Sequence, residues 1–126
     1  MVDPLLYMGV EVEWSTYALL DQGVIQPKAL MEIIRIIQEA IHNAVIRGKC
    51  TFLSVVAQRY DNEFTITIVN KGGQPFSEEN RKGLGILSMV SRASKIGGAV
   101  EIIPNDSGAI LSLTVPSLSS KNVMRS

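Results

Sequence analysis

Apolar and polar residues alternate in several short stretches of the chain, beginning with GVEVEWST at residues 9–16. A period of two predicts a strand with one buried face. The segments FLSVVAQRY (52–60) and EFTITIVN (63–70) are rich in β-branched and aromatic residues, and only Asp61 and Asn62 separate them. They are therefore predicted to pair as a hairpin.

Two other stretches repeat their apolar residues with the spacing of a helix. Pro27 suits the first position of a helix, and from there to Arg47 the apolar residues keep helical spacing, with Gly48 placed to end it. A second amphipathic helix is predicted further along, ending at the glycine pair 97–98. Its apolar positions are Ile86, Met89, Val90, Ala93 and Ile96.

The remaining segments complete one domain, predicted to span residues 9–116. AVEII (99–103) and AILSLTV (109–115) flank a turn-forming PNDSG and predict a second hairpin. Residues 71–83 are glycine-rich and polar without a period, which is typical of a loop. Residues 117–126 are predicted to be a flexible C-terminal tail.

The order of these elements predicts the fold class. Strands and helices do not alternate strictly, so an all-parallel doubly wound sheet is disfavoured. The apolar stripes of both helices need a sheet to cover them. We therefore expect an α+β fold: a two-layer α/β sandwich with a mixed, mainly antiparallel sheet and the helices packed on one face.

Composition narrows the function. The 126-residue chain has 12 basic and 12 acidic residues and no net charge, so it offers no broad attraction to nucleic acid or to an anionic membrane. No signal peptide is expected, because the start MVDPLLYMGV lacks a basic segment followed by a long apolar run. No membrane-spanning segment is expected either, because Arg35 and Glu39 interrupt the most hydrophobic helix. Its one cysteine, Cys50, is interpreted as a free, inert thiol, which fits a cytoplasmic setting.

Four polar residues interrupt the first helix at intervals of four: Arg35, Glu39, Asn43 and Arg47. One interpretation is a solvated stripe stabilised by ion pairs between residues four apart. The other is a functional face. The downstream GLGILSM (83–89) favours it, since a glycine turn that opens a helix is a ready phosphate site.

Taken in order, the motifs resemble a known family. IIQEAIHNAVIRG (36–48), VNKGGQPF (69–76), GLGILSMVSRASKIGGAVEI (83–102) and SGAILSLTVP (107–116) are similar to the ATP-binding domain of GHKL (Bergerat-fold) ATPases. Within that superfamily they resemble the catalytic domain of sensor histidine kinases with a short nucleotide lid. The resemblance implies the histidine kinase ATPase fold, with ATP and Mg²⁺ bound between the helices.

The resemblance also implies roles for single residues. Asn43 would supply an oxygen to Mg²⁺ next to the nucleotide phosphates, and Glu39 would be the catalytic residue that orients or deprotonates the nucleophile. Gly72 would leave room for adenine, and residues 74–82 would form the lid. The full set of expected nucleotide contacts is Asn43, Arg47, Asn70, Gly72, Gly83, Leu84, Gly85, Ile86 and Met89.

Three positions depart from the family pattern. Asn70 stands where the family usually has an Asp that accepts a hydrogen bond from the adenine amine. An amide accepts without charge, so adenine binding is expected to be weaker by about tenfold. Ala109 replaces a common Thr, and Ile46 replaces a basic residue for which Arg47 compensates.

The partners follow from the resemblance. Histidine kinases phosphorylate a histidine on a dimerisation domain, which then passes the phosphoryl group to a response regulator. His42 lies inside the ATP-site motif and is not expected to be the acceptor. The chain is therefore interpreted as the catalytic part of a longer kinase, such as the cytoplasmic part of a membrane-bound sensor. Two alternatives stay open: an anti-sigma-factor-type serine kinase, and a degenerate nucleotide-binding module without catalysis.

Overall fold

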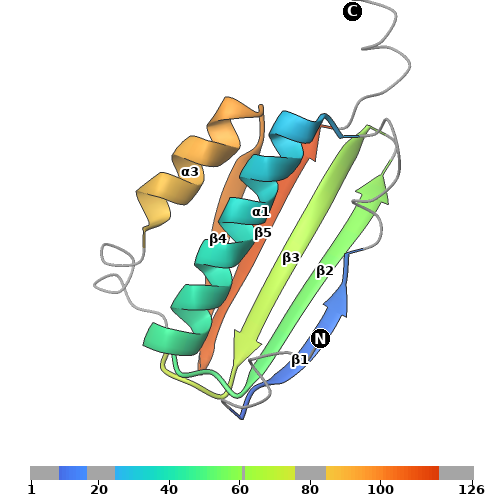
Figure 1. Cartoon of the computed structure of the whole chain (residues 1–126). Coiled ribbons are helices and arrows are strands. Elements are labelled where there is room, and N and C mark those ends of the chain that lie inside the picture. Colours follow the sequence, from blue (N-terminus) through green and yellow to red (C-terminus); the bar gives the residue numbers. More distant parts are fainter. Residues whose placement is uncertain (1–8, 17–24, 61, 76–84, 117–126) are drawn as a thin grey trace, which may run out of the picture.

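A computed structural model describes residues 9–16, 25–60, 62–75 and 85–116 of the chain. Within these ranges two α-helices lie against one five-stranded sheet (Figure 1). The elements are β1 (Glu11–Ser15), α1 (Pro27–His42), a π-helical turn (Asn43–Arg47), β2 (Phe52–Tyr60), β3 (Glu63–Lys71), α3 (Ile86–Lys95), β4 (Ala99–Asn105) and β5 (Gly108–Pro116).

The sheet has the strand order β1-β2-β3-β5-β4. β1 pairs with β2 in parallel, and the other three pairings are antiparallel. Both predicted hairpins are present, with Tyr60 opposite Glu63 in the first and Asn105 opposite Gly108 in the second. Pro104 lies within the edge strand β4, where a missing backbone N–H is tolerated.

Both helices cover the same face of the sheet, as predicted (Figure 1). On β3 the side chains of Phe64, Ile66 and Ile68 point to that face and are buried, whereas Thr65 and Thr67 between them lie on the open face and are only partly buried. This alternation follows from the two-residue period of a strand. The mixed sheet and the helix layer confirm the α+β two-layer sandwich.

The first helix differs from the prediction in its last turn. The α-helix ends at His42, and residues Asn43–Arg47 form a π turn in which the Gly48 N–H donates to the Asn43 carbonyl at 2.8 Å. At the end of the turn, Gly48 has a backbone conformation that any residue can adopt. Glycine fits there because it lacks a Cβ, which would lie only 2.8 Å from the Ala44 carbonyl oxygen. Single π turns are often found at functional sites.

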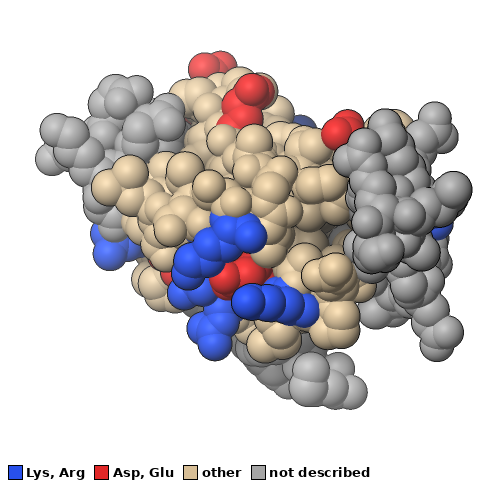
Figure 2. Space-filling model, turned by 90° about the horizontal axis from the view of Figure 1, so that it is seen from above, with Lys and Arg blue, Asp and Glu red and all other residues tan. Residues whose placement is uncertain are grey.

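An ion pair joins the two helices. Arg92 Nη1 on α3 lies 2.9 Å from Glu32 Oε1 on α1, and both side chains are partly exposed. Figure 2 shows Lys and Arg side chains around an acidic group on one side of the molecule, while most of the remaining described surface in that view is uncharged. No described helix is long and apolar enough to cross a lipid bilayer.

Candidate nucleotide-binding site

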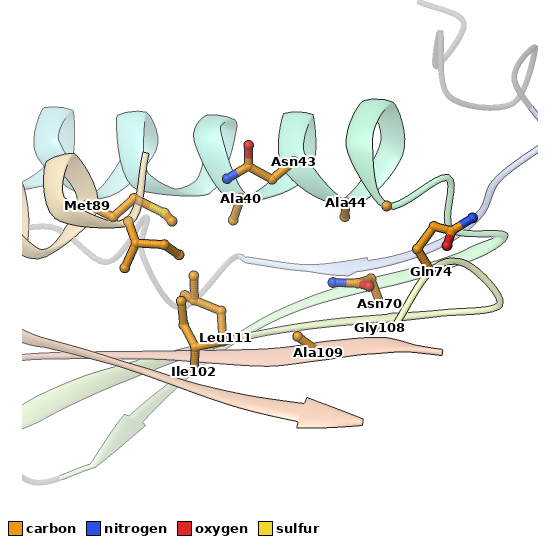
Figure 3. A pocket seen from close by; sticks show the side chains of 12 residues that line it. Ala40, Asn43, Ala44, Asn70, Gln74, Met89, Ile102, Gly108, Ala109 and Leu111 are labelled. Carbon is orange, nitrogen blue, oxygen red and sulfur yellow. The ribbon is translucent and has the colours of Figure 1, made fainter. Parts of the chain in front are cut away.

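The main pocket lies where the second half of the first helix passes over the sheet. The helix turns its small residues Ala40 and Ala44 toward the sheet there, and β5 contributes Gly108 and Ala109 from below. Because these side chains are short, they leave a pocket of about 510 Å³, counting the solvent at its open mouth. Figure 3 shows them facing one another across the pocket.

The larger lining residues give the pocket an apolar floor and a polar rim. Met89 of α3 closes one side, and Leu111 and Ile102 form the floor (Figure 3). Ile86, also on α3, is a further lining residue. Three amide side chains, Asn43, Asn70 and Gln74, complete the lining. An apolar slot with a few polar groups at its edge suits a flat heterocycle.

Hydrogen bonds from two directions hold the loop after β3 in place. On one side, the Gly72 N–H donates to Ser107 Oγ at 3.0 Å and the Gly73 N–H donates to the Ser107 carbonyl at 2.9 Å. On the other, the Gln74 N–H donates to the Gly48 carbonyl at 2.7 Å. The β4–β5 turn and the end of the helix therefore fix the backbone that carries Asn70 and Gln74.

Glu39 and Asn43, one turn apart, line two adjoining clefts. Asn43 is buried and lines the main pocket. Glu39 is partly buried and lines a polar cleft of about 740 Å³ between α1 and α3, again counting open solvent. Met89 lines both clefts, so it forms the wall between them. The carboxylate and the amide thus lie on the same side of the molecule.

The four residues of the predicted polar face differ in burial. Arg35 is exposed, Glu39 partly buried, Asn43 buried and Arg47 exposed. Four residues turn an α-helix by about 40° more than a full turn, so each residue of the series is rotated relative to the one before. The π turn then changes this rotation before Arg47, which is not among the residues that line the pocket.

The beginning of α3 meets the carboxylate of Glu39. Gly85 precedes the helix with φ +68°, a left-handed conformation that favours glycine, and a Cβ there would overlap Glu39 Oε1. Among the described residues, no side chain caps the helix. Its first backbone N–H groups lack intrahelical acceptors, and Ile86 beside them lines the pocket. This end of α3 can accept an anion next to the apolar slot.

The remaining predicted contacts are distributed as follows. Asn70 and Ile86 line the main pocket, and Met89 lines both clefts. Gly72 does not line the pocket; it has φ +78° and packs against Thr51. Gly83, Leu84 and lid residues 76–82 lie outside the described residues, as does the predicted tail.

Sequence reasoning did not single out several lining residues. These are Ala40, Ala44, Gly48, Gln74, Ile102, Gly108 and Leu111. Ala40, Ala44, Gly48 and Gly108 differ from other core positions only in their small size, whereas Ile102 and Leu111 are as large and apolar as the rest of the core.

Two further groups bear on metal and redox chemistry. Among the described residues no cluster of three or more His, Cys, Asp or Glu side chains could hold a metal ion. Cys50 is buried, and this burial raises the pKa of its thiol above the usual value. The thiol is therefore protonated at neutral pH, in agreement with an inert cysteine.

Comparison with known proteins bears on the fold. No family model matches the sequence. The sensor histidine kinase LiaS of Bacillus subtilis is 25% identical over 95 residues, which are 75% of this chain and 25% of that protein. The chain thus spans about a quarter of the length of this curated relative.

Two solved structures share the architecture. The histidine kinase domain of the blue-light activated histidine kinase EL346 from Erythrobacter litoralis has a TM-score of 0.72 at 14% identity, covering 92% of this chain and 55% of that one. The ATP binding domain of PrrB from Mycobacterium tuberculosis has a TM-score of 0.70 at 23% identity, covering 91% and 85%.

These likenesses give the class of the fold. The chain has the fold of the ATP-binding catalytic domain of histidine kinases, and the resemblance predicted from its motifs is confirmed.

Proposed function

We propose that this chain is the ATP-binding catalytic domain of a sensor histidine kinase. It would bind ATP and donate the γ-phosphoryl group to a histidine on a dimerisation domain, and a response regulator would then receive the phosphoryl group. The observation that carries the proposal is the apolar slot beside Asn43, with Glu39 next to it against the uncapped start of α3. The names of the related proteins support the same function. A cytoplasmic location is part of the proposal, and the free thiol of Cys50 fits it.

Each part of the site suits one part of MgATP. The adenine would lie between Ala40, Ala44 and Ala109, with Asn70 at its edge. The phosphates would extend toward the amides that open α3, where the helix dipole favours negative charge. Mg²⁺ usually takes only one or two protein oxygens in addition to phosphates and water. The side-chain amide oxygen of Asn43 would therefore be enough as its protein ligand. The ion would neutralise phosphate charge during transfer.

Glu39 is proposed as the catalytic residue. Its carboxylate lies against Gly85, beside the N-terminus of α3, where the terminal phosphate would lie. From there it would orient the incoming imidazole of the acceptor histidine and accept its proton. His42 and Arg92 line the same cleft. A basic side chain there would stabilise the charge of the transferred group.

Equilibrium titration with the β,γ-imido analogue of ATP and Mg²⁺ tests the binding step. Saturable binding below millimolar concentration is expected, and no saturation up to millimolar concentration would overturn the proposal.

The variant Glu39→Gln tests the catalytic step. It should retain the affinity for the ATP analogue but slow phosphoryl transfer to the dimerisation domain of the full-length protein by about 10²- to 10⁴-fold. The control Glu101→Gln makes the same change at an exposed position on β4 and should change neither the affinity nor the rate of transfer. Binding without transfer by the wild type would instead indicate a degenerate binding module.

A further inference from the structure

The polar side chains that line the main pocket are all neutral. They are the amides of Asn43, Asn70 and Gln74, and the other lining residues of the described chain are apolar or glycine. A carboxylate can only accept hydrogen bonds, whereas an amide both donates and accepts. These amides can therefore contact a ligand edge that donates hydrogen bonds as well as one that accepts them.

Asn70 is the amide that the fold directs toward the base. On β3, Phe64, Ile66 and Ile68 point to the helix-facing side of the sheet, and Asn70 is the next residue of β3 on that side. Its cross-strand neighbour on β5 is Ala109, which is too short to cover it. Figure 3 shows the side-chain amide of Asn70 pointing into the pocket with its nitrogen toward the interior.

The backbone around Asn70 is fixed while its side-chain amide is not. Pairing with both β2 and β5 holds the residue, and its carbonyl oxygen accepts a hydrogen bond from Asn105 Nδ2 at 3.4 Å. Oδ1 lies against Gly108, where a Cβ would overlap it. Among the residues that the structure describes, none hydrogen-bonds the side-chain amide of Asn70. A half-turn about its last torsion exchanges donor and acceptor.

The two classes of purine differ at the edge that such a group would contact. Adenine carries an amine at its six position, which donates, whereas guanine and hypoxanthine carry a carbonyl there, which accepts. A carboxylate at position 70 would pair with the amine and face the carbonyl acceptor to acceptor. The Asn70 amide can pair with either, through its oxygen or its nitrogen.

We propose that the pocket accepts 6-oxopurine nucleoside triphosphates as well as ATP, with Asn70 as the specificity-determining residue. The inference rests on the proposed function, because it assumes that the pocket holds a purine nucleotide. Inosine triphosphate is the sharpest probe, since its base differs from adenine only at the six position and the adjoining ring nitrogen. Guanosine triphosphate adds a further amine and so also tests the width of the slot.

Titration of the whole chain with the β,γ-imido analogues of ATP and ITP, each with Mg²⁺, tests the inference. The wild type should bind both within about tenfold of one another. Asn70→Asp should favour the adenine nucleotide by about a hundredfold, because a buried acceptor facing a second acceptor loses its hydrogen bond. Asn62→Asp makes the same substitution at an exposed position beyond the other end of β3 and should leave the ratio unchanged.

The outcomes separate the inference from the proposed function. If neither nucleotide binds, the proposed function fails and the inference with it. If the wild type binds the ATP analogue but the ITP analogue at least a hundredfold more weakly, the function stands and the inference is overturned. An unchanged ratio in a folded Asn70→Asp variant would show that another group reads the base. The wild-type comparison remains decisive if that variant does not fold.

Discussion

The two halves of the first helix cover the same sheet but leave different amounts of space beneath them. In the first half Ile33 and Ile36 are fully buried, and the sheet below supplies large apolar side chains such as Phe64, Leu113 and Val115. In the second half the helix turns Ala40 and Ala44 to the sheet, and the strands supply Ala109 and Asn70. One end of the layer is packed solid and the other is hollow.

This difference shows how a small domain separates stability from binding. Close packing at the first end removes apolar surface from water and supplies much of the folding free energy. The other end gives up that packing and keeps a slot for a ligand. The π turn at Asn43–Arg47 and the hydrogen bonds of Ser107 and Gly48 fix the hollow end where side-chain packing does not.

The largest expected effect is on stability, from Ile36→Ala at the packed end. Removal of a buried isoleucine side chain should lower the free energy of unfolding by about 2–5 kcal/mol, through lost burial and the cavity left behind. Nucleotide affinity of the folded variant should not change. Ile46→Ala in the π turn that follows the helix, where the side chain is 48% exposed, is the control and should cost much less stability. Urea unfolding with and without the ATP analogue measures both quantities, and a large loss of affinity in folded Ile36→Ala would show that the two ends are not independent.

The converse change, Ala109→Leu, fills the hollow end. Nucleotide affinity should fall by at least about a hundredfold, or about 2.7 kcal/mol, because the leucine side chain occupies the proposed adenine slot. The free energy of unfolding should change by less than about 1 kcal/mol, since the new side chain has space to enter. Ser112→Leu places the same side chain on the open face of β5 and should leave affinity unaltered. Equal affinities in all three proteins would mean that the ligand lies elsewhere.

The packed end was easier to predict from the sequence than the hollow one. Large apolar residues at helical or strand spacing predicted both helices, both hairpins and the face that each buries, because burial of such residues dominates folding. The hollow is defined by what its residues lack: Ala40, Ala44 and Gly108 differ from other core positions only in size. Whether these residues come together depends on the order of the strands in the sheet, and the spacing of apolar residues along the chain does not predict that order.

The polar residues of the site show a second limit. Asn43 and Asn70 were predicted because their positions match family motifs, and both line the pocket. Arg47 was predicted as a nucleotide contact because it would compensate for the basic residue that the family has at position 46. The π turn that includes it is not visible in the residue pattern, and Arg47 is not among the residues that line the pocket. Gln74 was predicted only as the first residue of the lid and not as a pocket residue, because its place depends on the Gly48 carbonyl, which anchors its backbone from a distant part of the chain.

The smallest expected effect distinguishes a glycine needed for its backbone from one that also borders the site. Gly85 and Gly97 both have positive φ, +68° and +73°, and alanine at either should cost about 1–2 kcal/mol of stability. Within the described part of the chain, a Cβ at Gly97 would meet only Pro116, with Cγ at 3.4 Å, whereas a Cβ at Gly85 would overlap the Glu39 carboxylate. Gly85→Ala alone should therefore displace Glu39.

Both variants can be compared by urea unfolding and by titration with the ATP analogue. Similar losses of stability are expected, together with a loss of nucleotide affinity of about tenfold, or about 1.4 kcal/mol, in Gly85→Ala only. The reason is local: the added methyl group pushes the carboxylate and the start of α3 apart, so the helix amides no longer face the phosphates. Equal affinity in the two variants would mean that Gly85 serves the turn and not the site, and would leave Asn43 and the apolar slot as the whole of the binding surface.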